Sequence, residues 1–246
     1  MVVEKLLLGI VQGITEFLPV SSSGHLVLLK HLFGVKEQGA FYEVFLHTAT
    51  FLSVVVVLRG KIFNLRSLWR YGWLSAIATL PLFAVVPFAH LVEETFNTPS
   101  LLPLTFSITS LFLLSTYLVR TSEGRRAGWK DALIMGVVQV LALLPGVSRS
   151  GITISTGLHR GLEPEEAFAL SFWMFLPAAL GSFVLEAVRV KEVSLTAWDG
   201  VVWITTFAVG VGSLMLLKRL LVNRRKFWVF GLYTVGVALL SAILLL

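Results

Sequence analysis

Cysteine is absent from the 246-residue chain, which excludes disulfide bonds, a thiol nucleophile and thiolate metal sites. Charge is also scarce: charged residues make up 14% of the sequence and hydrophobic residues 56%, whereas a typical soluble domain has about 25% charged residues. The mean hydropathy is +0.86. A soluble domain of this composition would expose large apolar patches. We therefore expect an integral membrane protein.

Basic residues outnumber acidic ones, and the net charge is +6. They gather in short connections between apolar runs, which is the pattern of cytoplasmic loops in membrane proteins. We therefore expect a membrane and no nucleic acid as a partner. The three connections assigned to the cytoplasm contain Arg59, Lys61, Arg66 and Arg70; Arg120, Arg125, Arg126 and Lys130; and Lys218, Arg219, Arg224, Arg225 and Lys226.

Six apolar runs approach the roughly 20 residues that a helix needs to cross a bilayer core. They cover about residues 43–58, 72–91, 101–119, 166–188, 201–217 and 227–246, and the first of them is short. We predict one transmembrane helix in each run. The whole chain then forms a single membrane domain of the all-α class.

Two segments resemble each other at a constant offset of 127 residues. The first runs from Gly9 to His25 and the second from Gly136 to Thr153, and each carries a proline and several serines inside an apolar run. Farther along, Gly34 matches Gly161 in the same register. We read an internal duplication, with repeats at 1–127 and 128–246. Paired, interrupted apolar segments at matching positions indicate a binding site buried in a membrane protein.

In each interrupted segment, the apolar stretch on either side of the break is too short to cross the bilayer core. The stretch from Glu4 to Leu18 would be about 22 Å long as a helix, against a core of about 30 Å, and Pro19 then ends it. We predict re-entrant hairpins at about 4–33 and 131–160, because a hairpin keeps all three basic connections on one side. Each repeat then has one hairpin and three spans, so the repeats have inverted topology and the hairpin tips meet near the midplane.

The tips carry the polar chemistry of the chain. Gln12 and Glu16 are four residues apart and share one helix face, and the Ser-rich tips read as caps of two returning half-helices, whose free N–H groups attract anions. An arginine adds donors that match phosphate oxygens. This set favours phosphoryl transfer. The remaining tip residues are Ser21, Ser22, Ser23 and His25 in the first hairpin and Ser148, Arg149, Ser150 and Thr153 in the second.

These motifs, Gln12-x-x-x-Glu16 with the following Pro-Val-Ser-Ser-Ser-Gly-His25 and Pro145-Gly-x-Ser148-Arg149-Ser150-x-x-Thr153, resemble the undecaprenyl pyrophosphate phosphatase (bacitracin-resistance) family along essentially the whole chain. The resemblance implies a multi-pass enzyme of the bacterial inner (plasma) membrane. Such an enzyme removes the terminal phosphate of undecaprenyl pyrophosphate, recycles the carrier for cell-wall precursors, and requires a divalent cation. The family accepts Glu or Gln where this chain has Gln12, which leaves Glu16 as the one acid of the first tip.

We therefore expect Glu16, helped by Gln12, to hold Mg²⁺ or Ca²⁺, and Arg149 to stabilise charge on the transferred phosphoryl group. Ser22 or a water molecule attacks, with His25 as the base or as the nucleophile itself. Gln12, the remaining serines and the threonine are expected to bind the polyprenyl pyrophosphate: Gln12, Ser21, Ser23, Ser148, Ser150 and Thr153. A homodimer is a further hypothesis.

The alternative function is transport. Inverted repeats with broken helices also occur in secondary transporters, so a polyprenyl-phosphate flippase or an anion carrier would share this architecture. Glu16 and His25 favour hydrolysis, because a carrier of a polyanion gains nothing from a carboxylate beside the phosphate unless a metal or proton lies between them. For Glu43, His47 and Ser171, which follow the hairpins on neighbouring spans, we favour packing over a supporting role.

Overall fold

The computed structural model describes residues 2–34, 40–119, 125–189, 195–222 and 227–246. It confirms an all-α protein, since the described residues contain no strand beyond an isolated bridge between Arg125 and Leu162. The first half contains α1 (Val2–Thr15), α2 (Ser22–Phe33), α3 (Ala40–Val57), α4 (Arg59–Ile62), α5 (Leu65–Phe83), α6 (Ala89–Phe96) and α7 (Leu102–Ser115). The second half contains α8 (Trp129–Gln139), α9 (Arg149–His159), α10 (Pro164–Arg189), α11 (Ala197–Val222) and α12 (Val229–Leu245).

Several of these helices are long and apolar enough to cross a membrane. The segments Pro99–Leu118, Pro164–Val184 and Ala197–Leu221 meet both requirements within the described ranges, and the bent pair α5 and α6 would make a fourth. Val44–Val57 and Val229–Leu245 are apolar but shorter. The predicted runs at 43–58 and 227–246 are therefore helical, but their described helices are short for a full crossing.

The predicted span at 72–91 is wrong as a single helix. Helix α5 begins earlier, at Leu65, because the Asn64 side chain caps it by accepting a hydrogen bond from Ser67 N at 3.1 Å. It ends at Phe83, and a short turn at Val86–Phe88 leads into α6 at a bend of 43°. Pro81 and Pro87 explain the break, because a proline removes a backbone donor and disfavours helical angles in the residue before it.

The first hairpin consists of α1 and α2. Helix α1 ends at Thr15, and a turn containing Pro19 leads to Ser21, the N-cap of α2, whose hydroxyl accepts a hydrogen bond from Gly24 N at 3.3 Å. The second hairpin repeats this design: Ser148, the residue equivalent to Ser21, caps α9 by accepting from Gly151 N at 3.2 Å. Both serine caps agree with the sequence prediction.

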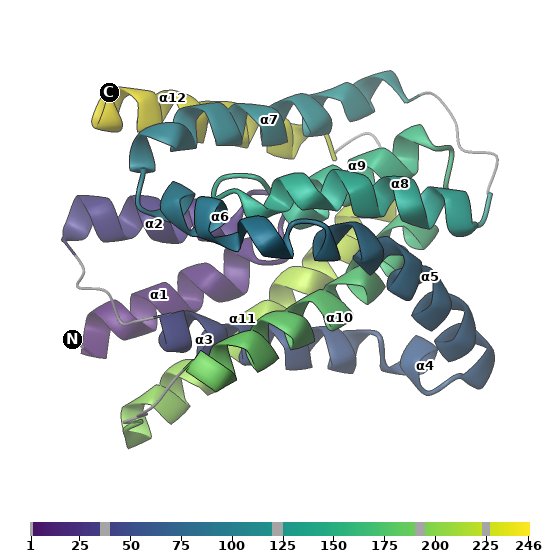
Figure 1. The fold of residues 1–246 in the computed structure, drawn as a ribbon, viewed down its shortest axis with the longest axis horizontal. Helices are drawn as coiled ribbons and strands as arrows, with labels where there is room; N and C mark the ends of the chain where they lie inside the picture. Colours follow the sequence, from purple (N-terminus) through teal and green to yellow (C-terminus); the bar gives the residue numbers. More distant parts are fainter. Residues whose placement is uncertain (1, 35–39, 120–124, 190–194, 223–226) are drawn as a thin grey trace.

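The tips of the two hairpins meet in the middle of the molecule (Figure 1). Ser21 Oγ also accepts a hydrogen bond from Gly146 N at 3.1 Å, and Ser150 Oγ donates to the carbonyl of Phe17 at 3.2 Å. The contact is so close that a Cβ on Gly24 would lie 2.6 Å from Gly146 Cα. Glycine at position 24 therefore permits the tips to touch.

The helices around the tips pack in matching pairs. In the first pair, α1 packs on α11 and its counterpart α8 packs on α5. In the second pair, α3 packs on α11 and its counterpart α10 packs on α5. Gly9 allows α1 to approach α11, and its equivalent Gly136 allows α8 to approach α5, since a Cβ at either position would lie under 3 Å from the neighbouring helix. Helices α3 and α10 pack together, as do α7 and α12.

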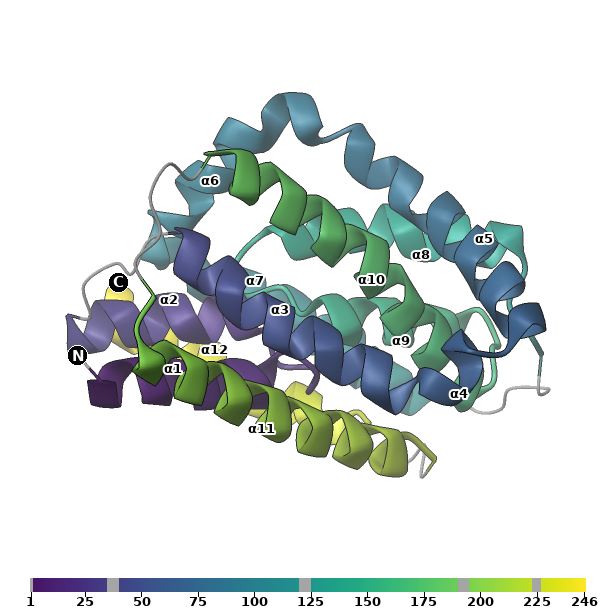
Figure 2. The same ribbon diagram turned by 90° about the horizontal axis from the view of Figure 1, so that it is seen from below.

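Buried acidic residues tie the helix ends together. Asp131 at the start of α8 receives hydrogen bonds from Arg125 at 2.8 and 2.9 Å and from Arg160 at 3.0 Å. Glu166 in α10 bonds to Arg70 and Tyr71 of α5. At the other end of the molecule, where Figure 2 shows both termini, Lys5 pairs with Asp199 at 2.6 Å.

Candidate active site

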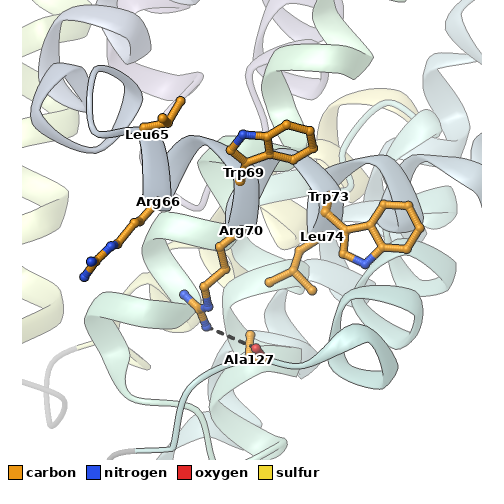
Figure 3. Close-up of a pocket in the computed structure, with 7 residues that line it drawn as sticks. All are labelled: Leu65, Arg66, Trp69, Arg70, Trp73, Leu74 and Ala127. Carbon is orange, nitrogen blue, oxygen red and sulfur yellow. Dashed lines mark hydrogen bonds between the residues drawn. The ribbon is translucent and has the colours of Figure 1, made fainter.

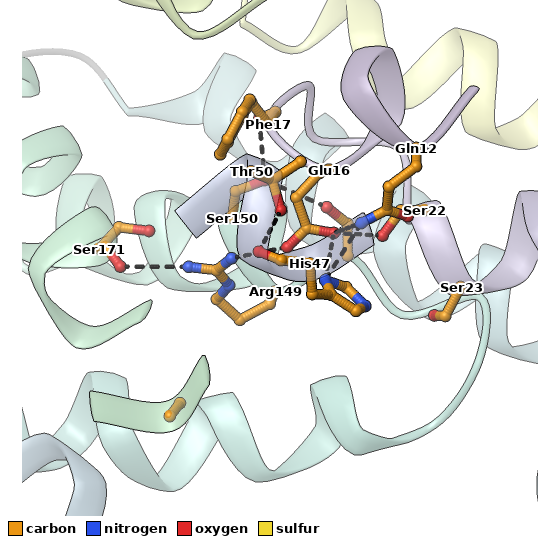
Figure 4. Close-up of polar contacts among 12 residues, drawn as sticks. Gln12, Glu16, Phe17, Ser22, Ser23, His47, Thr50, Arg149, Ser150 and Ser171 are labelled. Carbon is orange, nitrogen blue, oxygen red and sulfur yellow. Dashed lines mark hydrogen bonds and ion pairs between the residues drawn. The ribbon is translucent and has the colours of Figure 1, made fainter. Parts of the chain in front are cut away.

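Glu16 is the centre of a polar cluster at the first tip (Figure 4). Its Oε2 accepts hydrogen bonds from Ser22 Oγ at 2.5 Å and from Gln12 Nε2 at 3.1 Å, and its Oε1 accepts one from Arg149 at 3.2 Å. The Glu16 side chain is 8% exposed. The structure thus brings Gln12, Glu16, Ser22 and Arg149 together, although Arg149 belongs to the other hairpin.

Arg149 is the first residue of α9, so this helix begins at the residue that pairs with Glu16. Its guanidinium carbon lies 4.2 Å from the centre of the Phe175 ring, a cation–π contact that supports a buried cation. The second described hydrogen bond, to Ser171 O, is long at 3.5 Å. Because the guanidinium has five N–H donors, it keeps donors for an anion while paired with Glu16.

Most of the predicted substrate-binding hydroxyls have framework contacts. Ser21 and Ser148 cap helices, and Ser150 bonds to the backbone of the opposite hairpin, as described above. Thr153 Oγ1 donates to the carbonyl of Arg149 at 2.7 Å. Ser23 is different, because it lines the cavity beside Glu16. Substrate binding by these five residues stays a prediction.

The structure does not bring His25 to the cluster. Its Nδ1 lies 2.7 Å from Ser21 O, its Nε2 lies 2.9 Å from the Tyr233 hydroxyl, and its ring stacks on that of Tyr233. His25 is also not among the residues that line the cavity at Glu16. The imidazole beside Glu16 belongs instead to His47 of α3, with Nδ1 3.7 Å from Glu16 Oε2.

The sequence favoured a packing role for His47. The structure contradicts this interpretation, because His47 lies beside Glu16. The signal that could have found it is a histidine within the apolar run that follows the first hairpin. Ser171, also placed in packing, does contact the site, since its hydroxyl lies 2.7 Å from Thr153 Oγ1 and its carbonyl accepts from Arg149. The side chain of Glu43 lies outside the described residues.

A cavity of about 460 Å³ opens over the cluster. Glu16, Ser23, His47 and Arg149 form its polar part, and the other walls are mostly apolar side chains of α3, α6 and α10. These walls include Val44, Phe51, Phe96, Phe175, Ala178 and Phe183. Such a cavity suits an amphiphile with an anionic head and a hydrocarbon tail.

A hollow of about 550 Å³ lies elsewhere, on α5, and is shown in Figure 3. Trp69, Trp73, Arg66 and Arg70 line it, and no carboxylate or serine does. Exposed tryptophans beside arginines are typical of a membrane interface. We therefore place the chemistry at Glu16 and not in this larger hollow.

The donor set at Glu16 fits a metal only in part. Among the described residues, no three His, Cys, Asp or Glu side chains are grouped to hold an ion. Gln12 Oε1 is buried without a described partner, but the NH₂ group of the same amide faces Glu16. The site therefore offers the Glu16 carboxylate, and Gln12 would join it only with its amide reversed. Mg²⁺ is commonly held by one or two carboxylates together with substrate phosphates, and this set fits such a shared ion.

Known proteins resemble the chain over nearly its full length. A family model described as bacitracin resistance protein BacA matches residues 5–240. An undecaprenyl-diphosphatase of Thermotoga maritima is 40% identical over 241 residues, with 96% of this chain and 98% of that protein covered. A protein of the same name from Methanococcus maripaludis strain C7 is 34% identical, with 94% and 95% covered. The family model covers most of the chain, and both relatives match it over nearly their full length. The chain therefore belongs to the bacitracin resistance protein BacA family.

Proposed function

We propose that this protein hydrolyses undecaprenyl diphosphate to undecaprenyl phosphate and inorganic phosphate. The relatives carry the name of that activity, and the observation that supports it most is the Glu16–Ser22–Arg149 cluster at the polar end of a largely apolar cavity. The diphosphate occupies the polar end, and the prenyl chain follows the apolar walls between α3, α6 and α10 toward lipid.

Ser22 is the nucleophile that the geometry favours over water, because its hydroxyl already donates to Glu16 at 2.5 Å. Glu16 takes the Ser22 proton as Oγ attacks the terminal phosphorus. The bridging P–O bond breaks and prenyl phosphate leaves. The proton on Glu16 leaves with the prenyl phosphate. Water then attacks the phosphoserine, Glu16 takes a proton from that water, and the P–Oγ bond breaks. Ser22 Oγ receives this proton from Glu16 as inorganic phosphate is released.

Arg149 stabilises the negative charge that spreads over the transferred phosphoryl group, together with the N–H groups at the start of α9. The predicted role of His25 as base would require its side chain to leave Tyr233, so we assign proton removal to Glu16. Glu16 is the residue that would hold a divalent cation, and Gln12 would join it only with its amide reversed so that Oε1 faces Glu16. When bound, that ion would neutralise part of the charge of the diphosphate.

We further propose that the two hairpins are re-entrant and that the halves form an inverted repeat in the bacterial plasma membrane. Support comes from the equivalent caps Ser21 and Ser148, from the positive φ angles of the equivalent residues Gly34 and Gly161, and from the matching helix pairs. In this arrangement the irregular backbone of both tips lies at membrane depth and is buried in protein. Burial is required there because lipid offers no hydrogen-bond partners to exposed backbone groups.

Phosphate release by the purified protein in detergent tests the function. We expect release from undecaprenyl diphosphate, loss in EDTA and recovery with Mg²⁺ or Ca²⁺. Ser22→Ala should abolish turnover if the hydroxyl attacks, whereas Ser107→Ala, which loses only a hydroxyl bonded to its own helix, should not change it. No release by the wild type at any metal concentration would contradict the proposal.

A further inference from the structure

His47 contacts the cluster from a third segment, α3. Its side chain is 38% exposed, and it lines the cavity that Arg149 and Ser23 also line. Its Nδ1 lies 3.1 Å from Gln12 Nε2. His47 lies outside both hairpin motifs, so its place at the site is an independent observation.

The hydrogen bonds of Gln12 decide which His47 nitrogen carries the proton. A carboxylate only accepts, and Glu16 is held as a carboxylate by Arg149, so the end of the Gln12 amide that faces Glu16 must be its NH₂ group. That group has two N–H bonds. One points to Glu16 Oε2, and the other is left for His47 Nδ1.

Nδ1 of His47 is therefore an acceptor, and a neutral ring then carries its hydrogen on Nε2. Figure 4 shows the ring with Nδ1 toward Gln12 and Glu16 and with the other nitrogen turned away from them. Within the described part of the chain, Nε2 has no hydrogen-bond partner. A donor with no partner thus borders the cavity beside Arg149.

We propose that His47 is a further catalytic residue whose Nε2–H donates a hydrogen bond to a diphosphate oxygen, and that Gln12 is the positioning residue that keeps the proton on Nε2. The proposal rests on the proposed hydrolysis. His47 and Arg149 then contact the diphosphate from different helices, while Glu16 lies between them as the base.

Two substitutions of His47 distinguish the roles of its two ring nitrogens. Glutamine can place an amide N–H near the position of Nε2, whereas asparagine reaches only as far as Nδ1. We expect His47→Gln to keep kcat/KM for phosphate release within about threefold of wild type. His47→Asn and His47→Ala should lose about 10- to 100-fold, which is the range for a hydrogen bond to a charged group. His31→Asn and His31→Gln, at an exposed position on α2, are the matched controls.

Inhibition by inorganic phosphate gives a second readout, which reports binding without turnover. The inhibition constant should rise in His47→Asn and stay near the wild-type value in His47→Gln. Thermal unfolding of each variant confirms that it is folded. Equal activity in the Asn and Gln variants, whether both are normal or both are impaired, would overturn the proposal. Failure of the wild type to release phosphate would instead overturn the proposed function.

The tautomer can be measured directly. In protein labelled with ¹⁵N-histidine, the His47 signals, assigned by their loss in His47→Gln, should show a protonated Nε2 and an unprotonated Nδ1. Gln12→Ala should shift this equilibrium toward Nδ1–H. A wild-type ring with its proton on Nδ1 would overturn the role of Gln12.

Discussion

Glu16 receives hydrogen bonds from side chains in both hairpins, so its substitution tests the base directly. Glu16→Gln keeps the size of the side chain but cannot take the Ser22 proton. We expect turnover to fall about 10²–10⁴-fold, the usual contribution of a general base. Phosphate release per mole of folded protein is the measurement, with Glu4→Gln near the start of α1 as a control. Activity within threefold of wild type would exclude Glu16 as the base.

Gln12→Glu tests the divalent cation. The new carboxylate would lie about as close to Glu16 as the present amide, 3.1 Å away, and two carboxylates at that distance repel each other unless a cation or proton lies between them. We expect the variant to remain active at saturating Mg²⁺ and to reach half-maximal activity at a lower Mg²⁺ concentration than the wild type. Inactivity at every Mg²⁺ concentration would show that the amide itself is required.

Residues that were predictable share one property: their position follows from local spacing. Glu16 lies one helical turn after Gln12, and a serine before an apolar run is a helix cap, so their places follow from short-range rules. The place of His47, and the pairing of His25 with Tyr233 across 208 residues, depend on how distant helices pack. No local pattern contains that information.

At the scale of elements, the contact between the two tips is the feature on which the site depends. Gly24→Ala would place a Cβ 2.6 Å from both Gly146 Cα and the Phe106 ring. We expect a loss of about 1–3 kcal/mol in stability, as for other overpacked sites, together with lower activity because Arg149 and Glu16 come from opposite tips. Thermal unfolding in detergent measures the first effect. Gly236→Ala is the control, because a Cβ at that position meets open space, and it should change neither stability nor activity. Equal stability and equal activity of the two variants would contradict the close contact.

Hairpins and caps were predictable because serine, glycine and proline act locally on the backbone. The bend between α5 and α6 was missed although Pro81 and Pro87 mark it, since hydropathy alone runs unbroken through the bend. Long apolar helices such as α11 were easier to place. Their composition indicates burial in lipid whatever their partners are.

At the scale of the whole molecule, Asp131 links the start of α8 to Arg125 and Arg160. Burial alone would raise the pKa of Asp131, but the hydrogen bonds from Arg125, from Gly128 N and from Arg160 outweigh it and hold the pKa below its usual value of 3.8. A lowered pKa stabilises the fold above the unfolded pKa, and this stabilisation is lost as pH falls through the folded pKa. We expect thermal stability to fall below about pH 4, and Asp131→Asn to weaken that dependence. An identical acid profile in the variant would contradict the role of this residue.

The orientation of the molecule can be tested because the chain has no cysteine of its own. A single cysteine at Ser67 should react only with membrane-permeant thiol reagents, since the basic connections are expected inside. One at Thr98 should react with impermeant reagents. Labelling of the cysteine at position 67 by an impermeant reagent outside intact cells would contradict the inverted-repeat proposal.

Hydrolysis and transport are separated most directly by following one substrate in proteoliposomes. Undecaprenyl diphosphate is supplied to wild-type and Glu16→Gln protein, and both phosphate release and movement of the intact lipid between leaflets are recorded. We predict phosphate release by the wild type and its loss in Glu16→Gln, with no movement of intact diphosphate that depends on the protein. Movement of the intact lipid by both proteins without release of phosphate would contradict the account.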